Sequence, residues 1–157
     1  MPRRSEIFFS RFDVPFDDLD AGGVLYNAHY VKYCDRARNK AFLSAGWSWD
    51  RMVASKSVLA VVGVEAEYRR AVRQEPIWIA TVFESSSDRF LEAAHVFLAG
   101  DLTEAEARAR ILAHAGPLEK MRGVNFRARF KLVPVAIGDF VPGSLDPEFL
   151  AGIMRLP

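Results

Sequence analysis

The spacing of apolar residues predicts a mixed α+β chain that opens with a strand and a long helix. Residues 7–14 are rich in phenylalanine and end at Pro15, a pattern typical of a strand. Over residues 28–45 the apolar positions recur at steps of three and four, which predicts a helix. Gly46 follows where a left-handed residue commonly ends a helix, and a second short helix is expected at 49–55.

The second half of the chain predicts further strands. Residues 58–72 alternate between apolar and polar positions, and 77–85 with 89–98 resemble a hairpin around a Ser-rich turn. Residues 103–115 alternate strictly between charged residues and alanines, and this period of two favours a strand although Ala, Glu and Arg prefer helices. Residues 124–137 are mixed: Phe126, Phe130 and Leu132 either pack on the core or belong to an added helix or an edge strand.

The C-terminal part has the composition of a peripheral segment. Residues 138–157 contain several Pro and Gly residues, which predicts a surface-draped tail with one short helix near 147–154. We find no internal repeat and no second domain. The sequence therefore predicts a single domain over 1–157, with its core at about 5–137.

The length, composition and net charge of the chain indicate which class of protein to expect. A chain of 157 residues with 50% apolar residues can bury a core without metals or disulfides. The formal net charge of +1 gives no reason to expect nucleic acid or an anionic membrane as a partner. The absence of an apolar signal segment and the single cysteine, Cys34, favour a cytoplasmic protein without disulfides.

We expect the chemistry in the segment 18–30. Asp20 precedes the predicted helix start by a few residues, and Gly22 and Gly23 permit positive φ and close approach of a substrate. The first helical turn leaves N–H groups without intrahelical partners, and such donors stabilise a developing oxyanion. A carboxylate beside free amide donors suits acyl transfer. Taken alone, Asp20 is better explained as a turn residue that accepts hydrogen bonds from nearby amides.

The wider motif carries a family resemblance. The chain reads DLDAGGVLYNAHY at 18–30 and continues with CDRAR at 34–38. It thereby resembles the hotdog-fold acyl-CoA thioesterases of the 4-hydroxybenzoyl-CoA thioesterase and YbgC type, over about residues 5–120. Two carboxylates, a glycine and a helix signature at fixed spacing are more specific than any one of them. The resemblance implies a hotdog fold, with a long helix wrapped by a curved antiparallel sheet of about five strands.

The resemblance also implies an activity, the hydrolysis of an acyl thioester to a carboxylic acid and free CoA. It places the catalytic carboxylate at Asp20, as nucleophile or general base, and the amide that polarises the carbonyl at Asn27. Many relatives carry histidine in place of Asn27, so His29 is either a substitute or a plain first-turn histidine. Asp18 is expected to support the loop by accepting backbone N–H bonds.

Further roles follow from the same resemblance. The expected substrate-binding residues are Gly22, Gly23, Tyr26, Arg69 and Arg89. Other basic candidates for the CoA phosphates are Arg70, Arg73, Lys120 and Arg122. Asp88 stands where relatives often carry a basic or small polar residue, which leaves an acyl carrier protein open as the alternative carrier. The family pairs through sheet edges, so a homodimer is implied, and a homotetramer as in many relatives.

Several structural expectations concern the helix and the pocket. We expect Tyr30 in the core, Cys34 packed, and Asp35 with Arg38 as a surface ion pair. The depth of the acyl pocket should depend on Trp47, Trp49, Met52 and Val61.

Other chemistries find less support. The three histidines and one cysteine lack zinc-site spacing, and no glycine-rich phosphate loop or serine elbow occurs. We therefore expect no metal and no cofactor apart from the CoA of the substrate. A hotdog hydratase or dehydratase would need a His and acid pair that the sequence does not show. A non-catalytic acyl-thioester-binding protein stays open, as does the identity of the acyl group.

Overall fold

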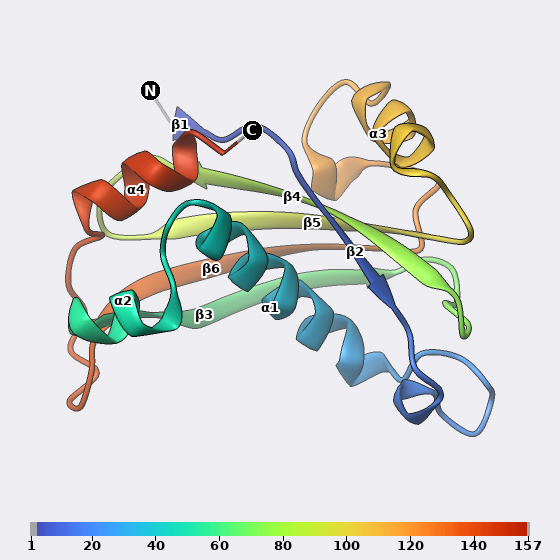
Figure 1. Ribbon diagram of the computed structural model, residues 1–157, viewed down its shortest axis with the longest axis horizontal. Coiled ribbons are helices and arrows are strands. Elements are labelled where there is room, and N and C mark those ends of the chain that lie inside the picture. Colours follow the sequence, from blue (N-terminus) through green and yellow to red (C-terminus); the bar gives the residue numbers. More distant parts are fainter. Residues whose placement is uncertain (1–2, 157) are drawn as a thin grey trace.

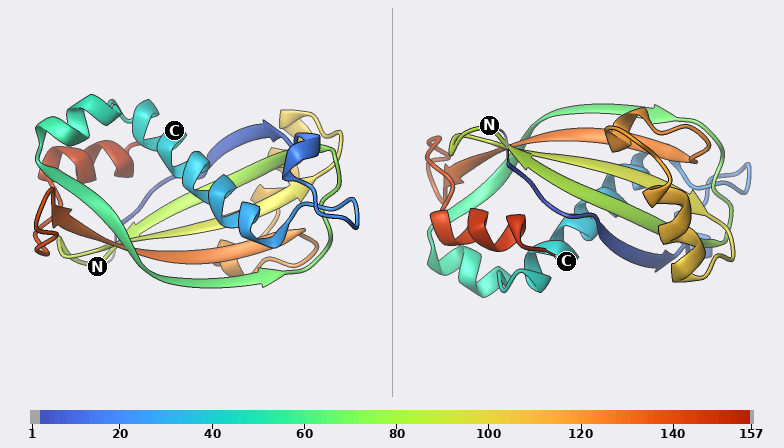
Figure 2. Two further views of the ribbon diagram at one scale, coloured as in Figure 1. Left: turned by 90° about the horizontal axis from the view of Figure 1, so that it is seen from below. Right: turned by 90° about the horizontal axis from the view of Figure 1, so that it is seen from above.

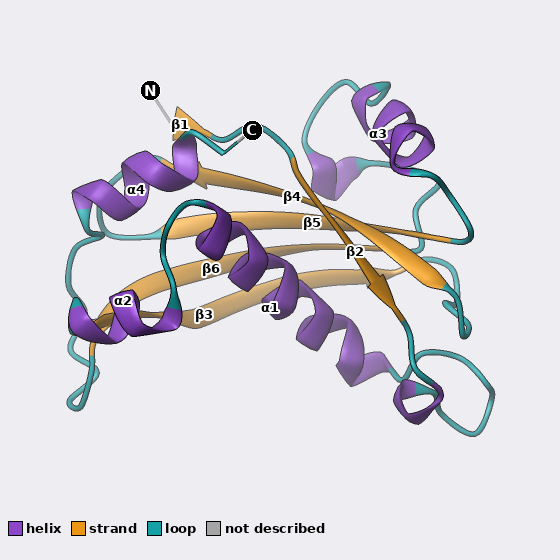
Figure 3. Cartoon of the chain, viewed as in Figure 1, coloured by secondary structure: helices purple, strands orange, loops and turns teal. Residues whose placement is uncertain are grey.

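The computed structural model describes residues 3–156 and shows one antiparallel sheet crossed by a long helix (Figures 1 and 3). The strands are β1 (Arg3–Arg4), β2 (Phe8–Asp13), β3 (Ser57–Tyr68), β4 (Pro76–Ser85), β5 (Leu91–Ala99) and β6 (Phe126–Ala136). They follow the order β1-β4-β5-β6-β3, and β2 also pairs with β4. β3 is therefore an edge strand.

The helices surround this sheet. They are α1 (Asn27–Ser44), α2 (Trp49–Ala54), α3 (Glu104–Leu112) and α4 (Pro147–Met154), with 3-10 turns η1 (Phe16–Asp18) and η2 (Leu118–Lys120). Figure 2 shows α2 and α4 at one end of the sheet and α3 near the other. The predicted α1, α2 and α4 and the predicted strands before residue 100 are confirmed to within a few residues. None of the helices in residues 3–156 is long and apolar enough to cross a bilayer.

Alternation along the strands divides the apolar residues between two cores. Ile79 and Phe83 of β4 point toward α1, where Ala37 and Ala41 are fully buried and allow a close approach to the sheet. Ala80 and Val82 point to the opposite face, where α3 and η2 cover a second cluster. Each face of the sheet is thus covered by its own helix.

The strand predicted at 103–115 is wrong, because this segment contains the helix α3. Thr103 caps its N-terminus, accepting from the Glu106 amide at 3.2 Å while the Glu106 carboxylate accepts from the Thr103 amide at 2.8 Å. Only Ala107 and Ile111 of the helix are buried. Because so little of α3 is covered, its exposed alanines and charged residues produce an alternation that resembles a strand.

The C-terminal segment also differs from the prediction. β6 lies between β5 and β3, so it is neither a helix nor an edge strand. α4 occupies its predicted position, but the tail is not draped over the surface. Phe149 and Ile153 are 5% and 0% exposed and belong to the α1-side core. The α4 side chains cover apolar surface of this core, because the Phe149 ring packs on those of Phe42 and Trp47.

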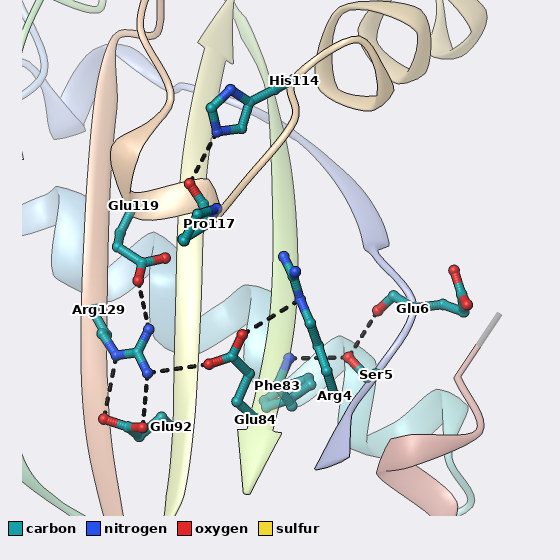
Figure 4. A network of polar contacts seen from close by, with 10 residues as sticks. All are labelled: Arg4, Ser5, Glu6, Phe83, Glu84, Glu92, His114, Pro117, Glu119 and Arg129. Carbon is teal, nitrogen blue, oxygen red and sulfur yellow. Dashed lines mark hydrogen bonds and ion pairs between the residues drawn. The ribbon is translucent and has the colours of Figure 1, made fainter. Parts of the chain in front are cut away.

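An ionic network fastens η2 to the outer face of the sheet (Figure 4). The Arg129 guanidinium of β6 binds Glu92 of β5 at 2.7 Å, Glu84 of β4 at 3.2 Å, and Glu119 of η2. Arg4 of β1 adds a contact to Glu84 at 3.4 Å. Glu92 and the other surrounding carboxylates raise the pKa of Arg129, and the network joins five chain segments.

Candidate active site

The loop that carries Asp20 is a tight, hydrogen-bonded turn between β2 and α1. Leu19 and Leu25 form an isolated antiparallel bridge, and the Asp20 amide donates to the Val24 carbonyl at 2.8 Å. Gly23 has a φ of 72°, which explains the glycine there. Gly22 does not need positive φ, but a Cβ at this position would come within 3.1 Å of Asp20 Oδ1.

Asp20 is exposed and is held through one oxygen. Its Oδ1 accepts from the Gly22 amide at 2.8 Å and lies 3.5 Å from the Val24 amide. Both hydrogen bonds described for this carboxylate go to Oδ1. The turn contacts expected of a plain loop aspartate are therefore present, and they leave Oδ2 without a hydrogen-bond partner among the described residues.

The N-terminus of α1 offers uncapped amides beside this loop. Its N-cap residue Tyr26 makes no side-chain capping bond, and no acidic residue lies in the first turn. Asn27 and Ala28 are exposed, and the described residues supply no acceptor for the Asn27 amide. The Tyr68 hydroxyl donates to the Asn27 carbonyl at 2.9 Å, which fixes the first turn. Free N–H groups at a helix N-terminus attract negative charge.

Asp18 has a different role from the one predicted. The Asp18 carboxylate accepts no backbone N–H bond from the described residues; it is buried and accepts from the Tyr33 hydroxyl at 2.7 Å and from Lys32 Nζ at 3.3 Å. It is the Asp18 carbonyl that accepts from a backbone amide, that of Tyr26 at 3.0 Å. His29 Nε2 lies 3.8 Å from the same carboxylate. These donors outweigh the effect of burial and lower the pKa of Asp18, while burial raises the pKa of Tyr33. Asp18 thus anchors the first two turns of α1.

His29 faces this anchor. Positions 27 and 29 point to different sides of a helix, because only residues three or four apart share a face. The imidazole of His29 therefore sits on the Asp18 side of α1, whereas Asn27 lies on the Tyr68 side. His29 does not take the place of a side chain at position 27.

The other predicted substrate residues lie apart from one another. Tyr26 is 49% exposed at the helix start, and Arg69 follows β3 at the same end of the sheet, paired with Glu67 at 3.3 Å. Arg89 lies in the β4–β5 turn at the other end. Phe97 of β5 stacks on Tyr30 near the loop, and Arg89 lies eight positions earlier in the chain, just before the start of β5. At the rise of an extended chain this spacing is about 25 Å. One chain does not bring Arg89 and Asp20 together.

A cavity of about 420 Å³ lies farther along α1, between this helix, α2 and β3. Its walls include Trp47, Trp49, Met52 and Val61, the four residues that the sequence indicated as pocket walls. A smaller apolar hollow of about 30 Å³ adjoins it, with Phe149 of α4 in its lining. The lining is mostly apolar, with polar groups confined to a few positions, as is common for small-molecule sites.

Sequence patterns did not reveal the buried polar residues behind this cavity. Arg38 is only 3% exposed and so is no surface residue, although its 3.4 Å contact with Asp35 exists. Arg38 Nη1 lies 3.2 Å from His95 Nε2, and Thr81 Oγ1 lies 2.9 Å from His95 Nδ1. Burial and the nearby guanidinium lower the pKa of His95 well below its usual range, so the imidazole is neutral and accepts from Arg38.

The expectations for Tyr30 and Cys34 are confirmed. Tyr30 is 4% exposed in the core, and Cys34 is fully buried with its thiol pKa raised by burial. No group of three or more His, Cys, Asp or Glu residues within 3–156 is arranged to hold a metal ion.

Comparison with known proteins adds a family assignment. A sequence profile of the thioesterase-like superfamily matches residues 14–115. Acyl-CoA thioesterase YbgC of Helicobacter pylori is 50% identical over 32 residues, covering 20% of this chain and 24% of the relative. Acyl-CoA thioester hydrolase YbgC of Escherichia coli O6:H1 is 33% identical over 60 residues, covering 38% and 45%. The chain thus spans less than half the length of these curated relatives.

The solved structures match over nearly the whole chain. The 1,4-dihydroxy-2-naphthoyl-CoA thioesterase from Synechocystis superposes with a TM-score of 0.74. Its identity to this chain is 14%, and the match covers 94% of this chain and 96% of that one. Such low identity supports a shared architecture and leaves the substrate undetermined.

Proposed function

Because the chain belongs to the thioesterase-like superfamily and has the hotdog fold, we propose that it hydrolyses acyl-CoA thioesters to a carboxylic acid and free CoA. The observation that carries this proposal is the exposed Asp20 carboxylate beside the uncapped N-terminus of α1. No cofactor is required, because CoA is part of the substrate.

Two routes lead from Asp20 to the products. In the first, Oδ2 attacks the thioester carbonyl carbon, the C–S bond breaks, and the thiolate leaves with the bonding electrons and then takes a proton from water. Water hydrolyses the resulting mixed anhydride and restores the carboxylate. In the second, Asp20 removes a proton from a water molecule as the water oxygen attacks the carbonyl carbon. The C–S bond then breaks, and the thiolate leaves with the bonding electrons and takes the proton back from Asp20, which restores the carboxylate. Both routes use the oxygen that the loop leaves free.

The Asn27 amide is the proposed oxyanion donor. Negative charge develops on the carbonyl oxygen in either route, and the first-turn amides of α1 are fixed before the substrate arrives. The Tyr68 hydroxyl on the Asn27 carbonyl supports this position. Gly22, Gly23 and Tyr26 flank the same space and are the proposed contacts to the thioester.

We propose that a second copy of the chain completes the site. Residues 61–68 of the edge strand β3 are exposed. Antiparallel pairing of this strand with β3 of a second copy would place the Tyr68 end of one copy beside the Val58 end of the other. The cavity lies about 12 to 24 Å along α1 from Asn27, too far for Asp20 of the same chain. The same pairing brings Asp20 of one copy toward the cavity of the other. A homodimer is therefore proposed, and assembly into tetramers remains a prediction.

Release of free thiol from a panel of acyl-CoA thioesters tests the proposal. The panel includes acetyl, hexanoyl, palmitoyl, benzoyl and 4-hydroxybenzoyl forms, each with wild type and Asp20→Asn. We expect turnover of at least one substrate by wild type and a loss of about 10²-fold or more in the variant. Equal rates would remove Asp20 from the mechanism. Absence of turnover with every acyl-CoA would instead favour an acyl carrier protein substrate or a non-catalytic binding protein.

A further inference from the structure

A buried cation forms part of the floor of the cavity between α1, α2 and β3. Arg38 of α1 lines this cavity although it is only 3% exposed. Its guanidinium carbon lies 4.2 Å from the centroid of the Phe130 ring on β6, so the charged group is on the sheet side of α1. Leu132 of the same strand is buried and lines the cavity as well, whereas Leu43 and Trp49 are exposed at the rim. The charge of Arg38 therefore lies at the bottom of the cavity.

Neutral groups hold the Arg38 guanidinium in one orientation. Nη1 donates to His95 Nε2 at 3.2 Å, and His95 Nδ1 in turn donates to Thr81 Oγ1 at 2.9 Å. This tautomer of His95 follows from the guanidinium, which can only donate. The face of the guanidinium packs on the Phe130 ring. Because Thr81 and His95 are fully buried and uncharged, they orient the cation without neutralising it.

The counter-charge for Arg38 is incomplete. Within residues 3–156 its nitrogens form one ion pair, with Asp35, whose side chain is 62% exposed and lies 3.4 Å from Nη2. Arg129 offers a comparison in the same protein, because its side chain is more exposed, at 26%, and contacts three carboxylates. Those carboxylates, Glu92 first among them, raise the pKa of Arg129, whereas burial lowers the pKa of Arg38. A cation buried with so little negative charge is costly, and an anion in the cavity offsets that cost.

Arg38 also keeps hydrogen-bond donors for a ligand. A guanidinium has N–H groups on Nε, Nη1 and Nη2, and the described bonds use one on each Nη atom. Nε has no acceptor among residues 3–156. The side-chain atoms that are both closed off from solvent and unpaired in this part of the chain are Ser10 Oγ and Arg127 Nε. Nε of Arg38 is therefore accessible from the cavity. A carboxylate can accept from Nε and Nη2 at the same time.

We propose that Arg38 makes the cavity selective for acyl groups that end in a carboxylate, as in the half-thioesters of dicarboxylic acids. This inference rests on the proposed function, because it takes the cavity as the site of the acyl group. Leu132 and Met52 belong to the apolar wall that contacts the carbon chain, and Arg38 binds the carboxylate at the floor. Arg38 contacts the substrate away from the thioester, so it determines specificity and takes no part in bond breaking.

Binding of two non-hydrolysable ligands tests the proposal without turnover. S-(5-carboxypentyl)-CoA and S-hexyl-CoA are thioethers with equal carbon number in the side arm, and only the first ends in a carboxylate. Isothermal titration calorimetry compares wild type, Arg38→Met, Arg38→Lys and the control Arg36→Met, which removes an exposed cation from the same helix. We expect wild type and the control to bind the carboxylated ligand about tenfold more tightly than S-hexyl-CoA. Arg38→Met should lose this preference, and Arg38→Lys should keep about threefold, because an ammonium is a point charge without the guanidinium fork.

The wild-type protein can refute the proposal whether or not Arg38→Met folds. Equal or weaker binding of the carboxylated thioether would do so, and binding of neither thioether would reject the cavity as the acyl site. Circular dichroism checks that Arg38→Met is folded. A preference for the carboxylated ligand that persists in the folded variant would mean that Arg38 does not bind the carboxylate.

Hydrolysis rates separate this proposal from the proposed function. The substrate pairs are adipoyl-CoA with hexanoyl-CoA, and 4-carboxybenzoyl-CoA with 4-hydroxybenzoyl-CoA. Within each pair that the enzyme hydrolyses, we expect kcat/KM to be about tenfold higher for the carboxylated member, and Arg38→Met should abolish that ratio. Equal rates within the pairs, or a preference for the hydroxyl, would keep the hydrolase and reject a carboxylate site. Tighter binding of the carboxylated thioether without any thiol release would keep the carboxylate site and reject the hydrolase.

Discussion

Phe149→Ala tests whether the C-terminal helix is part of the core. Phe149 is 5% exposed, and its ring lies 5.3 Å from that of Trp47 and 5.2 Å from that of Phe42. Truncating a buried phenylalanine to alanine costs about 3–5 kcal/mol, as lost burial plus the cavity left behind. Because two aromatic neighbours lose their partner, we expect a value near 4 kcal/mol.

The assay is thermal and guanidinium unfolding followed by circular dichroism. For a chain of this size, a loss of about 4 kcal/mol lowers Tm by roughly 8–16 °C. Phe140→Ala is the matched control, because Phe140 is 66% exposed and should change stability by less than about 0.5 kcal/mol. If both variants lost the same small amount of unfolding free energy, the C-terminal segment would be peripheral, and α4 would not be part of the α1-side core.

Two further predictions concern stability. His95 is buried and neutral in the folded state, where its pKa is lowered, so the unfolded chain binds the proton more readily. The contribution of His95 to the free energy of unfolding should be fully present above pH 6.5. Below that pH the free energy of unfolding should fall by up to about 1.4 kcal/mol for each pH unit. Denaturant titrations at pH 5.0 and 7.5 check this, and His95→Gln should flatten the difference; an equally steep loss in that variant would show that other groups cause it. Thr103→Ala removes the N-cap of α3 and should cost about 1 kcal/mol, measured by urea unfolding, whereas a neutral result would mean that the capping box does not hold α3.

Local periodicity was sufficient for much of the fold. The apolar steps of three and four over α1 arise because one face of this helix is buried. The apolar runs of β4 and β5 arise because both faces of the sheet are buried there. Both patterns can be recognised from the sequence. α3 was missed because a nearly uncovered helix has little apolar face. The T-x-x-E spacing of Thr103 and Glu106 was the available signal, and it outweighs alternation among alanines.

Some residues of the candidate site could be predicted from a local motif, and others come together only in the folded chain. Asp20 and Asn27 lie within one short motif, so the sequence alone was sufficient to recognise its resemblance to a known family. Arg38 and His95 are 57 residues apart and come into contact only because β5 packs against α1. No local sequence pattern predicts this contact. The anchoring role of Asp18 likewise depends on side chains more than ten residues away.

We propose that the two aspartates of the loop have different roles: Asp20 acts in catalysis, and Asp18 holds the first two turns of α1. The most direct measurement is kcat/KM for acyl-CoA hydrolysis together with Tm, for wild type, Asp20→Asn and Asp18→Asn. We predict that Asp20→Asn keeps its Tm and loses about 10²-fold or more in kcat/KM, because its carboxylate is exposed and only accepts turn amides. Asp18→Asn should lose about 2 kcal/mol of stability, because the charge that accepts from Tyr33 and Lys32 is gone. If the Asp20→Asn protein had wild-type turnover, or lost activity only because it unfolded, Asp20 would not be a catalytic residue.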